Sequence, residues 1–262
     1  MYSILKATIF LLLTVAAMAG CSQRAAKETS SPPESATNES KPKHPRGEDH
    51  MQGHPPIDCP LHKAGIDASK MKPFEETEKY IAFLERPDRA KWQKPDEVVN
   101  ALNLSGDETV VDVGAGSGYF SFRFAEKLKQ GKVVAVDIEP EMIRHIHHKA
   151  MTTGVENITA SLTKPDDPGV IESADLVFIC DVLHHVQDRV AWLKRIADTV
   201  KPGARLILIE FKEGDLPQGP PTSMKIPKKD LMELAKKAGF SFVREHKDLL
   251  PYQVFLEFRK EK

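Results

Sequence analysis

The sequence has no excess of either charge. Its 262 residues carry 37 lysines and arginines against 38 aspartates and glutamates, which leaves a formal net charge of −1. Proteins that bind nucleic acid through its phosphates present a clearly basic surface. This composition offers no electrostatic case for such a partner, so we expect no nucleic acid to bind.

Cysteine is also scarce. The three cysteines are Cys21, Cys59 and Cys180, and no pattern pairs them, so no disulfide framework is expected. Cys180 ends an apolar run, which favours a buried and inert thiol. Cys59 lies in the histidine-bearing segment 50–62, where a Cys-x-x-His spacing is compatible with zinc or copper. The prolines of that segment and its spacing favour a solvated linker, and we expect no metal site.

No apolar run reaches the length of about 20 residues that a comfortable membrane span needs. The N-terminal run Ala7–Gly20 follows a positively charged start and fits a signal peptide. Its end, Met18-Ala19-Gly20-Cys21, resembles the bacterial lipobox. That resemblance implies acylation of Cys21, with palmitate among its acyl chains, and Ser22 favours the outer membrane facing the periplasm. A cleaved secretory signal or a short membrane anchor is the alternative.

The segment after the cysteine has hardly any apolar residues. Ser22 to about His50 is rich in Ser, Pro, Lys, Glu and Thr, and such a composition cannot bury enough surface to offset its ordering entropy. We therefore expect a disordered tether. The predicted domain organisation is a signal peptide over residues 1–20, a lipidated N-terminus and linker over 21–70, and a folded domain over 71–262.

From about residue 95 the chain alternates between apolar runs and amphipathic segments. The expected strands are 109–113, 133–137, 158–162, 176–180, 205–211, 240–245 and 253–259. Continuous Val/Ile/Leu runs between helices predict a parallel sheet covered on both faces. The last two strands are joined by a short turn and predict an antiparallel hairpin. The expected fold is α/β: a doubly wound, Rossmann-like, mostly parallel sheet that ends in this hairpin.

A glycine-rich turn follows the first strand. Gly114, Gly116 and Gly118 come directly after Asp112, and Asp137 ends the next strand. Glycines allow unusual backbone angles and close approach, and the helix that opens next points its N–H groups at a ligand. A carboxylate at the end of the second strand can accept both ribose hydroxyls. This unit predicts a site for an adenosine-like cofactor.

Four segments together resemble the class I S-adenosylmethionine-dependent methyltransferase family. In chain order they are Val110–Gly118, Val136–Ile138, Asp175–His185 and Val200–Glu210. Any one of them is a weak signal, whereas four in order at the family's spacing are specific. The resemblance runs from about Pro95 onward and is nearest to small-molecule methyltransferases of the quinone-biosynthesis and arsenite-methylating type. It implies S-adenosylmethionine as the cofactor.

The same resemblance implies which residues bind that cofactor. The three glycines of the turn would form a backbone wall, and Asp112 would hold the methionine end. Asp137 would take the ribose hydroxyls and Ile138 would pack on the adenine. Asp181, after the fourth strand, would frame the site. A nicotinamide enzyme is disfavoured, because Tyr119 stands where the G-x-G-x-x-G fingerprint requires its last glycine.

Two adjacent histidines also follow the fourth strand. His184 and His185 begin a loop at the edge of the sheet where ligands bind in open α/β folds. A histidine there can act as a base near neutral pH. We expect one of the two to contact the substrate and leave open which. The segment Arg89–Pro95 is either a lid or a packed helix, and Lys212–Ile226 would line the acceptor pocket by analogy with related proteins.

The sequence therefore predicts a methyltransferase that acts on a small-molecule acceptor from an exported, membrane-anchored domain of the bacterial envelope. The alternative is a non-catalytic envelope protein that keeps the fold and binds a ligand or a partner. Export raises the question of how the cofactor would reach the domain, because S-adenosylmethionine is made in the cytosol. Neither the acceptor nor the oligomeric state can be read from the sequence.

Overall fold

The computed structural model describes residues 74–261. The signal peptide, Cys21, the linker and the segment 50–62 lie outside the described residues, and so does the expected domain start at Met71. Among the residues that are described, no helix combines the length and the apolar character needed to cross a membrane.

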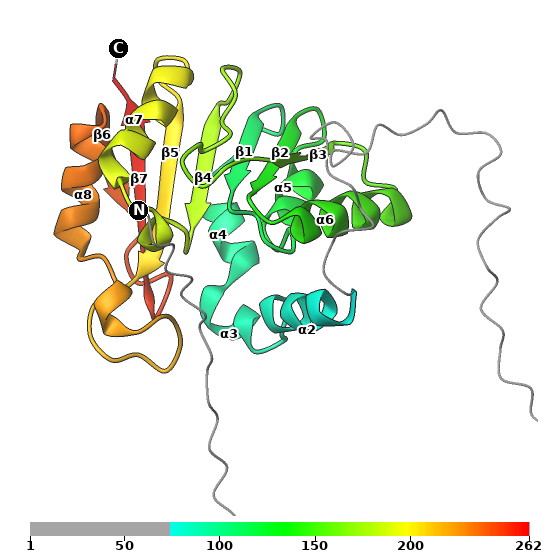
Figure 1. The fold of residues 1–262 in the computed structure, drawn as a ribbon. Coiled ribbons are helices and arrows are strands. Elements are labelled where there is room, and N and C mark those ends of the chain that lie inside the picture. The colour runs from blue at the N-terminus through cyan, green and yellow to red at the C-terminus, as the bar shows by residue number, and fades with distance from the viewer. Residues whose placement is uncertain (1–73, 262) are drawn as a thin grey trace, which may run out of the picture. The chain divides into compact units, whose positions relative to one another are not determined.

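Helices and strands alternate along the described chain (Figure 1). The helices are α2 (Phe74–Leu84), α3 (Arg89–Gln93), α4 (Pro95–Ala101), α5 (Ser121–Lys127), α6 (Pro140–Thr153), α7 (Arg189–Thr199) and α8 (Lys228–Lys237). The strands are β1 (Thr109–Val113), β2 (Lys132–Asp137), β3 (Ile158–Leu162), β4 (Leu176–Cys180), β5 (Arg205–Phe211), β6 (Phe240–Glu245) and β7 (Gln253–Lys260). Two short 3-10 helices, η2 (Leu183–His185) and η3 (Thr222–Met224), follow β4 and β5.

The seven strands form one sheet in the order β3-β2-β1-β4-β5-β7-β6. Strands β1 to β5 run parallel, and β7 pairs antiparallel with both β5 and β6. This confirms the predicted α/β sheet and its terminal hairpin. The hairpin is inserted in reverse order, with its second strand inside the sheet and β6 at the edge, a detail the sequence did not indicate.

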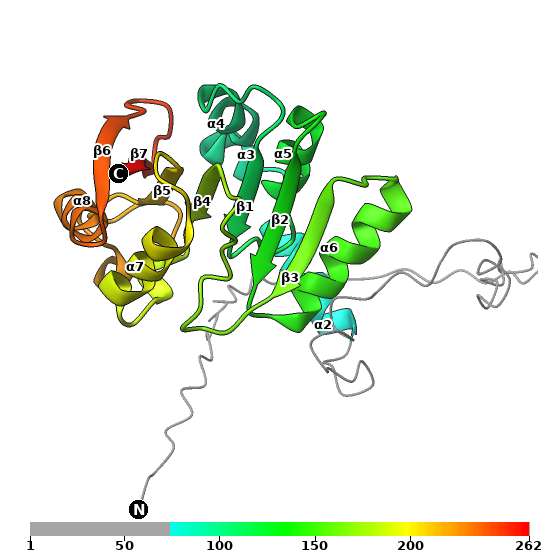
Figure 2. The same ribbon diagram turned by 90° about the horizontal axis from the view of Figure 1, so that it is seen from above.

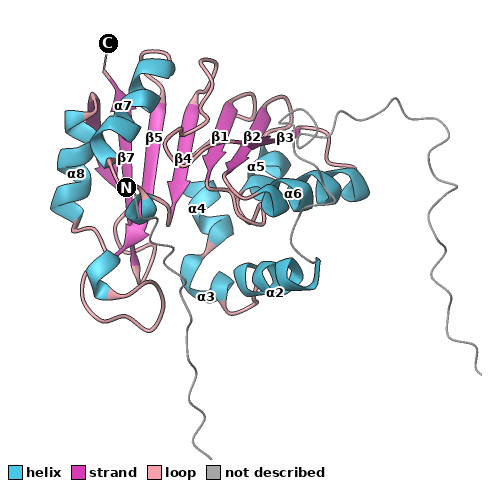
Figure 3. Cartoon of the chain, in the orientation of Figure 1, coloured by secondary structure: helices cyan, strands magenta, loops and turns pink. Residues whose placement is uncertain are grey.

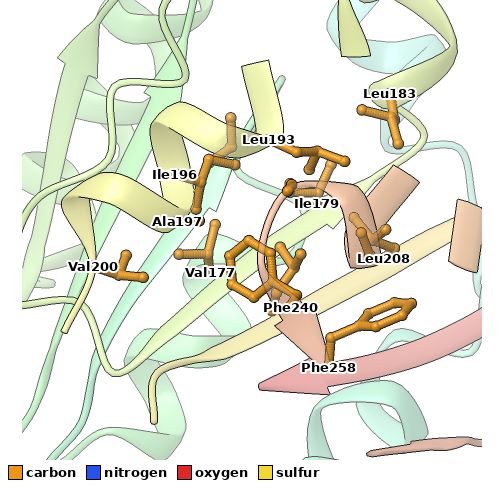
Figure 4. Close-up of a cluster of buried hydrophobic side chains, with 14 of the residues drawn as sticks. Val177, Ile179, Leu183, Leu193, Ile196, Ala197, Val200, Leu208, Phe240 and Phe258 are labelled. Carbon is orange, nitrogen blue, oxygen red and sulfur yellow. The ribbon is translucent and has the colours of Figure 1, made fainter. Parts of the chain in front are cut away.

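Helices cover both faces of the sheet (Figures 2 and 3). Helices α4, α5 and α6 pack on one face and α7 and α8 on the other. Figure 4 shows part of the hydrophobic core between the sheet and helices α7 and α8, where Val177 and Ile179 of β4 lie near Ile196 of α7 and Phe240 of β6. Every residue of β1 is buried, as expected for a central parallel strand that is covered on both sides.

Helices α2 and α3 lie beyond the carboxyl ends of the parallel strands (Figure 1). Side-chain contacts tie this segment to the rest of the domain. Lys149 of α6 donates to Glu85 Oε1 at 2.7 Å, and Arg86 Nη2 donates to Gln218 Oε1 at 2.8 Å. Because ligands bind at the carboxyl ends in sheets of this kind, this segment lies over the edge that carries the candidate site.

Candidate functional site

The glycine turn sits directly after β1 and is closely packed. Gly114, Gly116 and Gly118 have φ angles of 71°, 56° and 78°. A Cβ atom at Gly114 would lie 2.3 Å from Cγ2 of Val182, and one at Gly118 would lie 2.8 Å from Cε2 of Phe122. The turn therefore needs glycine both for its left-handed backbone and for its close contacts.

Replacing Gly114 by alanine is expected to destabilise the fold by about 2 to 5 kcal/mol, from left-handed strain together with overpacking against Val182. Gly154 is a matched control, because it has a φ of 69° and nothing within 4 Å of its Cβ position. Gly154→Ala should cost only the strain, about 1 to 2 kcal/mol. Urea unfolding measures both, and equal losses would refute the packing argument.

Asp137 ends β2 and faces the glycine turn. Its Oδ2 accepts the Gly116 N–H at 2.8 Å, and its Oδ1 accepts the Glu139 N–H at 2.9 Å. The residue is 8% exposed, and burial raises the pKa of its carboxyl group. Each oxygen keeps a second lone pair, so this carboxylate can accept two more hydrogen bonds from vicinal hydroxyls. Next to it, Ile138 is 46% exposed, a large apolar side chain at the surface of the site.

Asp112 lies on β1 just before the turn and is fully enclosed. Ser121, the first residue of α5, donates its hydroxyl to Asp112 Oδ2 at 2.6 Å. Burial raises the pKa of Asp112 to about 7, against the effect of that hydrogen bond, and the nearby charge of Asp137 adds to the rise. A carboxyl group in this setting gains most from a cationic partner.

Asp181 follows β4 in a left-handed conformation, with φ of 59°. Two glutamine side chains donate to its carboxylate. Gln93 Nε2 lies 3.0 Å from Oδ2, and Gln253 Nε2 lies 2.7 and 2.8 Å from the two oxygens. Burial, with the charge of Glu210 next in effect, raises the pKa of Asp181 to about 7. Asp181 thus links Gln93 of α3 and Gln253 of β7 to the carboxyl end of β4.

The two histidines have different environments. His184 is 9% exposed, and its Nδ1 lies 2.7 Å from Oε2 of Glu210. Burial lowers the pKa of His184, but the hydrogen bond and the charge of Glu210 outweigh it, and the net shift is upward. His185 is exposed as a whole residue. Partial burial of its ring, followed by the charge of His184, lowers its pKa. The two rings are 4.1 Å apart. The structure thus distinguishes two histidines that the sequence left equivalent: His184 is buried against a carboxylate, and His185 is not.

Residues 89–93 of the segment 89–95 form the packed helix α3 over the site, and Pro95 begins α4. Gln93 is completely buried and Trp92 is 8% exposed. Arg89 donates to the Leu84 carbonyl at 2.6 Å, and its guanidinium stacks 4.1 Å from the centre of the Tyr119 ring. Leu84 in turn lies 3.3 Å from the Cβ position of Gly116. The packed-helix alternative is therefore the one observed, and the helix contributes directly to the site.

The sequence did not indicate three residues that contact Asp181 or His184 in the site: Glu210, Gln93 and Gln253. Glu210 had a signal, since it is a charged residue near the end of the apolar run of β5. The two glutamines had none, because their partner Asp181 is 88 and 72 residues away in sequence.

Only the end of the expected acceptor segment, residues 223–226, lines a cavity of about 340 Å³, together with Arg189 and one side of α8. Arg189 donates to the carbonyl oxygens of Leu183 and His184, which places this cavity next to η2. Its volume lies within the range of small-molecule sites.

The histidines of α6 do not form a metal centre with other residues of the described chain, where no group of three or more candidate ligands occurs. His145 Nε2 lies 4.0 Å from Glu85 Oε1.

Comparison with known proteins gives a consistent result. Residues 111–206 match a family model described as a methyltransferase domain. Phosphoethanolamine N-methyltransferase 3 of Arabidopsis thaliana is 29% identical over 146 residues, 55% of this chain and 27% of the relative. Aklanonic acid methyltransferase DauC of Streptomyces is 33% identical over 130 residues, 48% of this chain and 59% of the relative. The chain thus spans only about a quarter to somewhat over half of these relatives.

A similar fold is seen in a crystal structure of a SAM-dependent methyltransferase from Aquifex aeolicus. It has a TM-score of 0.64 and 23% identity, and the match covers 70% of this chain and 97% of that one.

Proposed function

We propose that this chain, whose residues 111–206 match a family model described as a methyltransferase domain, is an S-adenosylmethionine-dependent methyltransferase that acts on a small-molecule acceptor. The observation that carries the proposal is the juxtaposition at one sheet edge. The glycine turn and Asp137, which suit a nucleoside, lie beside the polar group of Asp181, His184 and Glu210, which suits an acceptor.

The residues present fit this cofactor. S-adenosylmethionine, when bound, supplies a methyl group that is already activated on a sulfonium sulfur. Asp137 would accept hydrogen bonds from the ribose hydroxyls, and Ile138 would pack on the adenine. Asp112 would hold the ammonium of the methionine end, which suits its buried carboxyl group. The glycine turn would form the wall beside it.

The protein's further task is to align the acceptor and to remove its proton. Alignment alone can lower a barrier by several kcal/mol. With Nδ1–H donating to Glu210, His184 offers Nε2 as a proton acceptor for a hydroxyl or an ammonium. Glu210 fixes the ring and stabilises its protonated form. An acceptor that carries no proton on its nucleophilic atom would not need this pair.

Calorimetry with S-adenosylmethionine on the full-length chain tests the cofactor, and transfer of a labelled methyl group to a panel of hydroxyl, amine and thiol compounds tests the reaction. We expect saturable binding and labelled product. Absence of binding at millimolar cofactor would overturn the proposal. Binding without transfer to any compound would favour the non-catalytic envelope protein instead.

We also propose that the domain is exported and anchored to the membrane through an acylated Cys21. The support is the N-terminal sequence alone, with its apolar run and its lipobox-like end. Growth of a bacterial host with a labelled fatty acid should label the native chain and not the Cys21→Ala variant, and fractionation should find the native chain in the outer membrane. Equal labelling of the two chains would refute the anchor.

The affinity for S-adenosylmethionine is expected to rise with pH through about 7. Below the raised pKa of Asp112, its carboxyl group must lose a proton before it can attract the ammonium of the cofactor. Linkage then gives up to about tenfold weaker binding per pH unit for each proton released. Calorimetry in buffers of different ionisation enthalpy measures that release. Asp112→Asn should flatten the pH dependence, and an unchanged slope would contradict this account.

A further inference from the structure

Two buried side chains near Asp181, at the carboxyl ends of the parallel strands, each have a polar atom without a hydrogen-bond partner among the described residues. These atoms are Nε1 of Trp92, an obligate donor, and Oε1 of Gln253, an acceptor. The two residues are 8% and 2% exposed. Buried polar groups are normally paired because leaving them unpaired is costly.

The orientation of the Gln253 amide follows from its neighbours. Its Nε2 donates to both oxygens of Asp181 at 2.7 and 2.8 Å. Turning the amide around would place its carbonyl oxygen against the Asp181 carboxylate, where two acceptors face each other. The unpaired atom of Gln253 is therefore the carbonyl oxygen, and a partner for it must donate.

Aromatic rings surround Trp92 at this point. Its ring centre lies 5.7 Å from that of Phe211, the last residue of β5, and 6.2 Å from that of Tyr252, just before β7. The segment 212–226 closes on the same rings, because a Cβ atom at Gly219 would lie 2.5 Å from Phe211 Cδ1. Gln93, next to Trp92, shares the Asp181 carboxylate with Gln253. Phe211 is the register partner of Gln253 and Tyr252 precedes it in sequence, so the ring of Trp92 packs on the two immediate neighbours of Gln253.

We propose that Trp92 and Gln253 form a binding subsite for a hydroxylated aromatic acceptor. A phenolic hydroxyl both accepts from an indole N–H and donates to an amide carbonyl, and its ring matches the aromatic rings around Trp92. A protonated amine donates but has no lone pair for Trp92, and an ether accepts but cannot donate to Gln253. The inference rests on the proposed function, since it names the acceptor class of the same site.

The two tryptophans of the chain, Trp92 and Trp192, make the test direct. In full-length Trp192→Phe, Trp92 is the only tryptophan fluorophore, and Trp192 itself packs in the hydrophobic core beneath α7 and α8, of which Trp92 is not a member. Catechol is the probe, 1,2-dimethoxybenzene lacks the donors, and benzylamine carries an ammonium. Each is titrated with S-adenosylhomocysteine present and absent. We expect catechol to change Trp92 fluorescence and to bind about tenfold more tightly than the other two.

Variants then separate the two contacts. Trp92→Phe keeps a ring and removes the N–H, so calorimetry should find catechol binding weakened about tenfold and benzylamine binding, which has no lone pair for Trp92, unchanged. Gln253→Leu should weaken catechol likewise, with thermal melting as the check on its fold. No catechol binding, tighter binding of benzylamine, or unchanged catechol binding by Trp92→Phe would each overturn the subsite. Binding of S-adenosylmethionine is measured on the same samples, so failure of the proposed function is seen separately.

Discussion

Asp137→Asn should bind S-adenosylmethionine about 100-fold more weakly than the native chain. The substitution removes the charge from two hydrogen bonds to the ribose hydroxyls, each worth about 1.5 to 3 kcal/mol when the acceptor is charged. It also turns an N–H₂ group toward one of the backbone donors, Gly116 or Glu139, that the carboxylate now satisfies. Calorimetry measures the loss directly.

S-adenosylhomocysteine separates the ribose contact from other effects. It shares the ribose and lacks the sulfonium charge, so its affinity should fall by the same factor. Asp198→Asn serves as the matched control, because Asp198 is an exposed residue of α7 that pairs only with Lys194 in the described structure. A loss smaller than about threefold, or an equal loss in the control, would remove Asp137 from the cofactor site.

Glu210→Ala is expected to destabilise the domain by about 3 to 5 kcal/mol. Its side chain and that of His184 are 2% and 5% exposed, and removal of one member leaves the other buried without its partner. Glu210→Gln keeps an oxygen that can accept from Nδ1–H and loses only the charge, so it should cost less. Urea unfolding of both variants gives the two free energies.

The pH dependence of this loss has a definite sign. The folded pKa of His184 lies above its ordinary value of 6.5, so the stabilisation from the charged pair is complete below about 6.5 and disappears as pH rises through the raised folded pKa. The difference between native and Glu210→Gln should therefore shrink as the pH rises from about 6.5 through the raised folded pKa of His184. Turnover should also fall strongly in His184→Gln and little in the exposed control His185→Gln. Equal losses in these two would refute the choice of His184.

The sequence predicted most of the sheet because each buried parallel strand has a recognisable pattern in its own few residues. Four of the five parallel strands, β1, β2, β4 and β5, appear as buried runs rich in Val, Ile and Leu, and β6 and β7 appear as a hairpin pair. Which hairpin strand lies next to β5 is a tertiary question, since both strands have similar composition. Packing between residues far apart in sequence decides the order of the two strands, and no local sequence pattern reports that packing.

The candidate site divides in the same way. Gly114, Asp137 and Asp181 could be found because each stands at the end of a recognisable strand, where the fold places ligands. The choice between His184 and His185 could not be made, because it depends on Glu210, 26 residues further along. Gln253 could not be found at all, since its importance comes entirely from a contact with a distant carboxylate.

The inserted position of β7 has a consequence for the synthesis of the protein. Translation produces β1 to β5 first, and β5 then presents a row of unpaired N–H and C=O groups until the last strand of the sheet in chain order arrives. The docking of β7 covers that row and buries Glu257 against Arg205. The nascent domain thus passes through a stage with an open, apolar strand edge. A chaperone or fast release would protect it most at that stage, before Gln253 reaches Asp181.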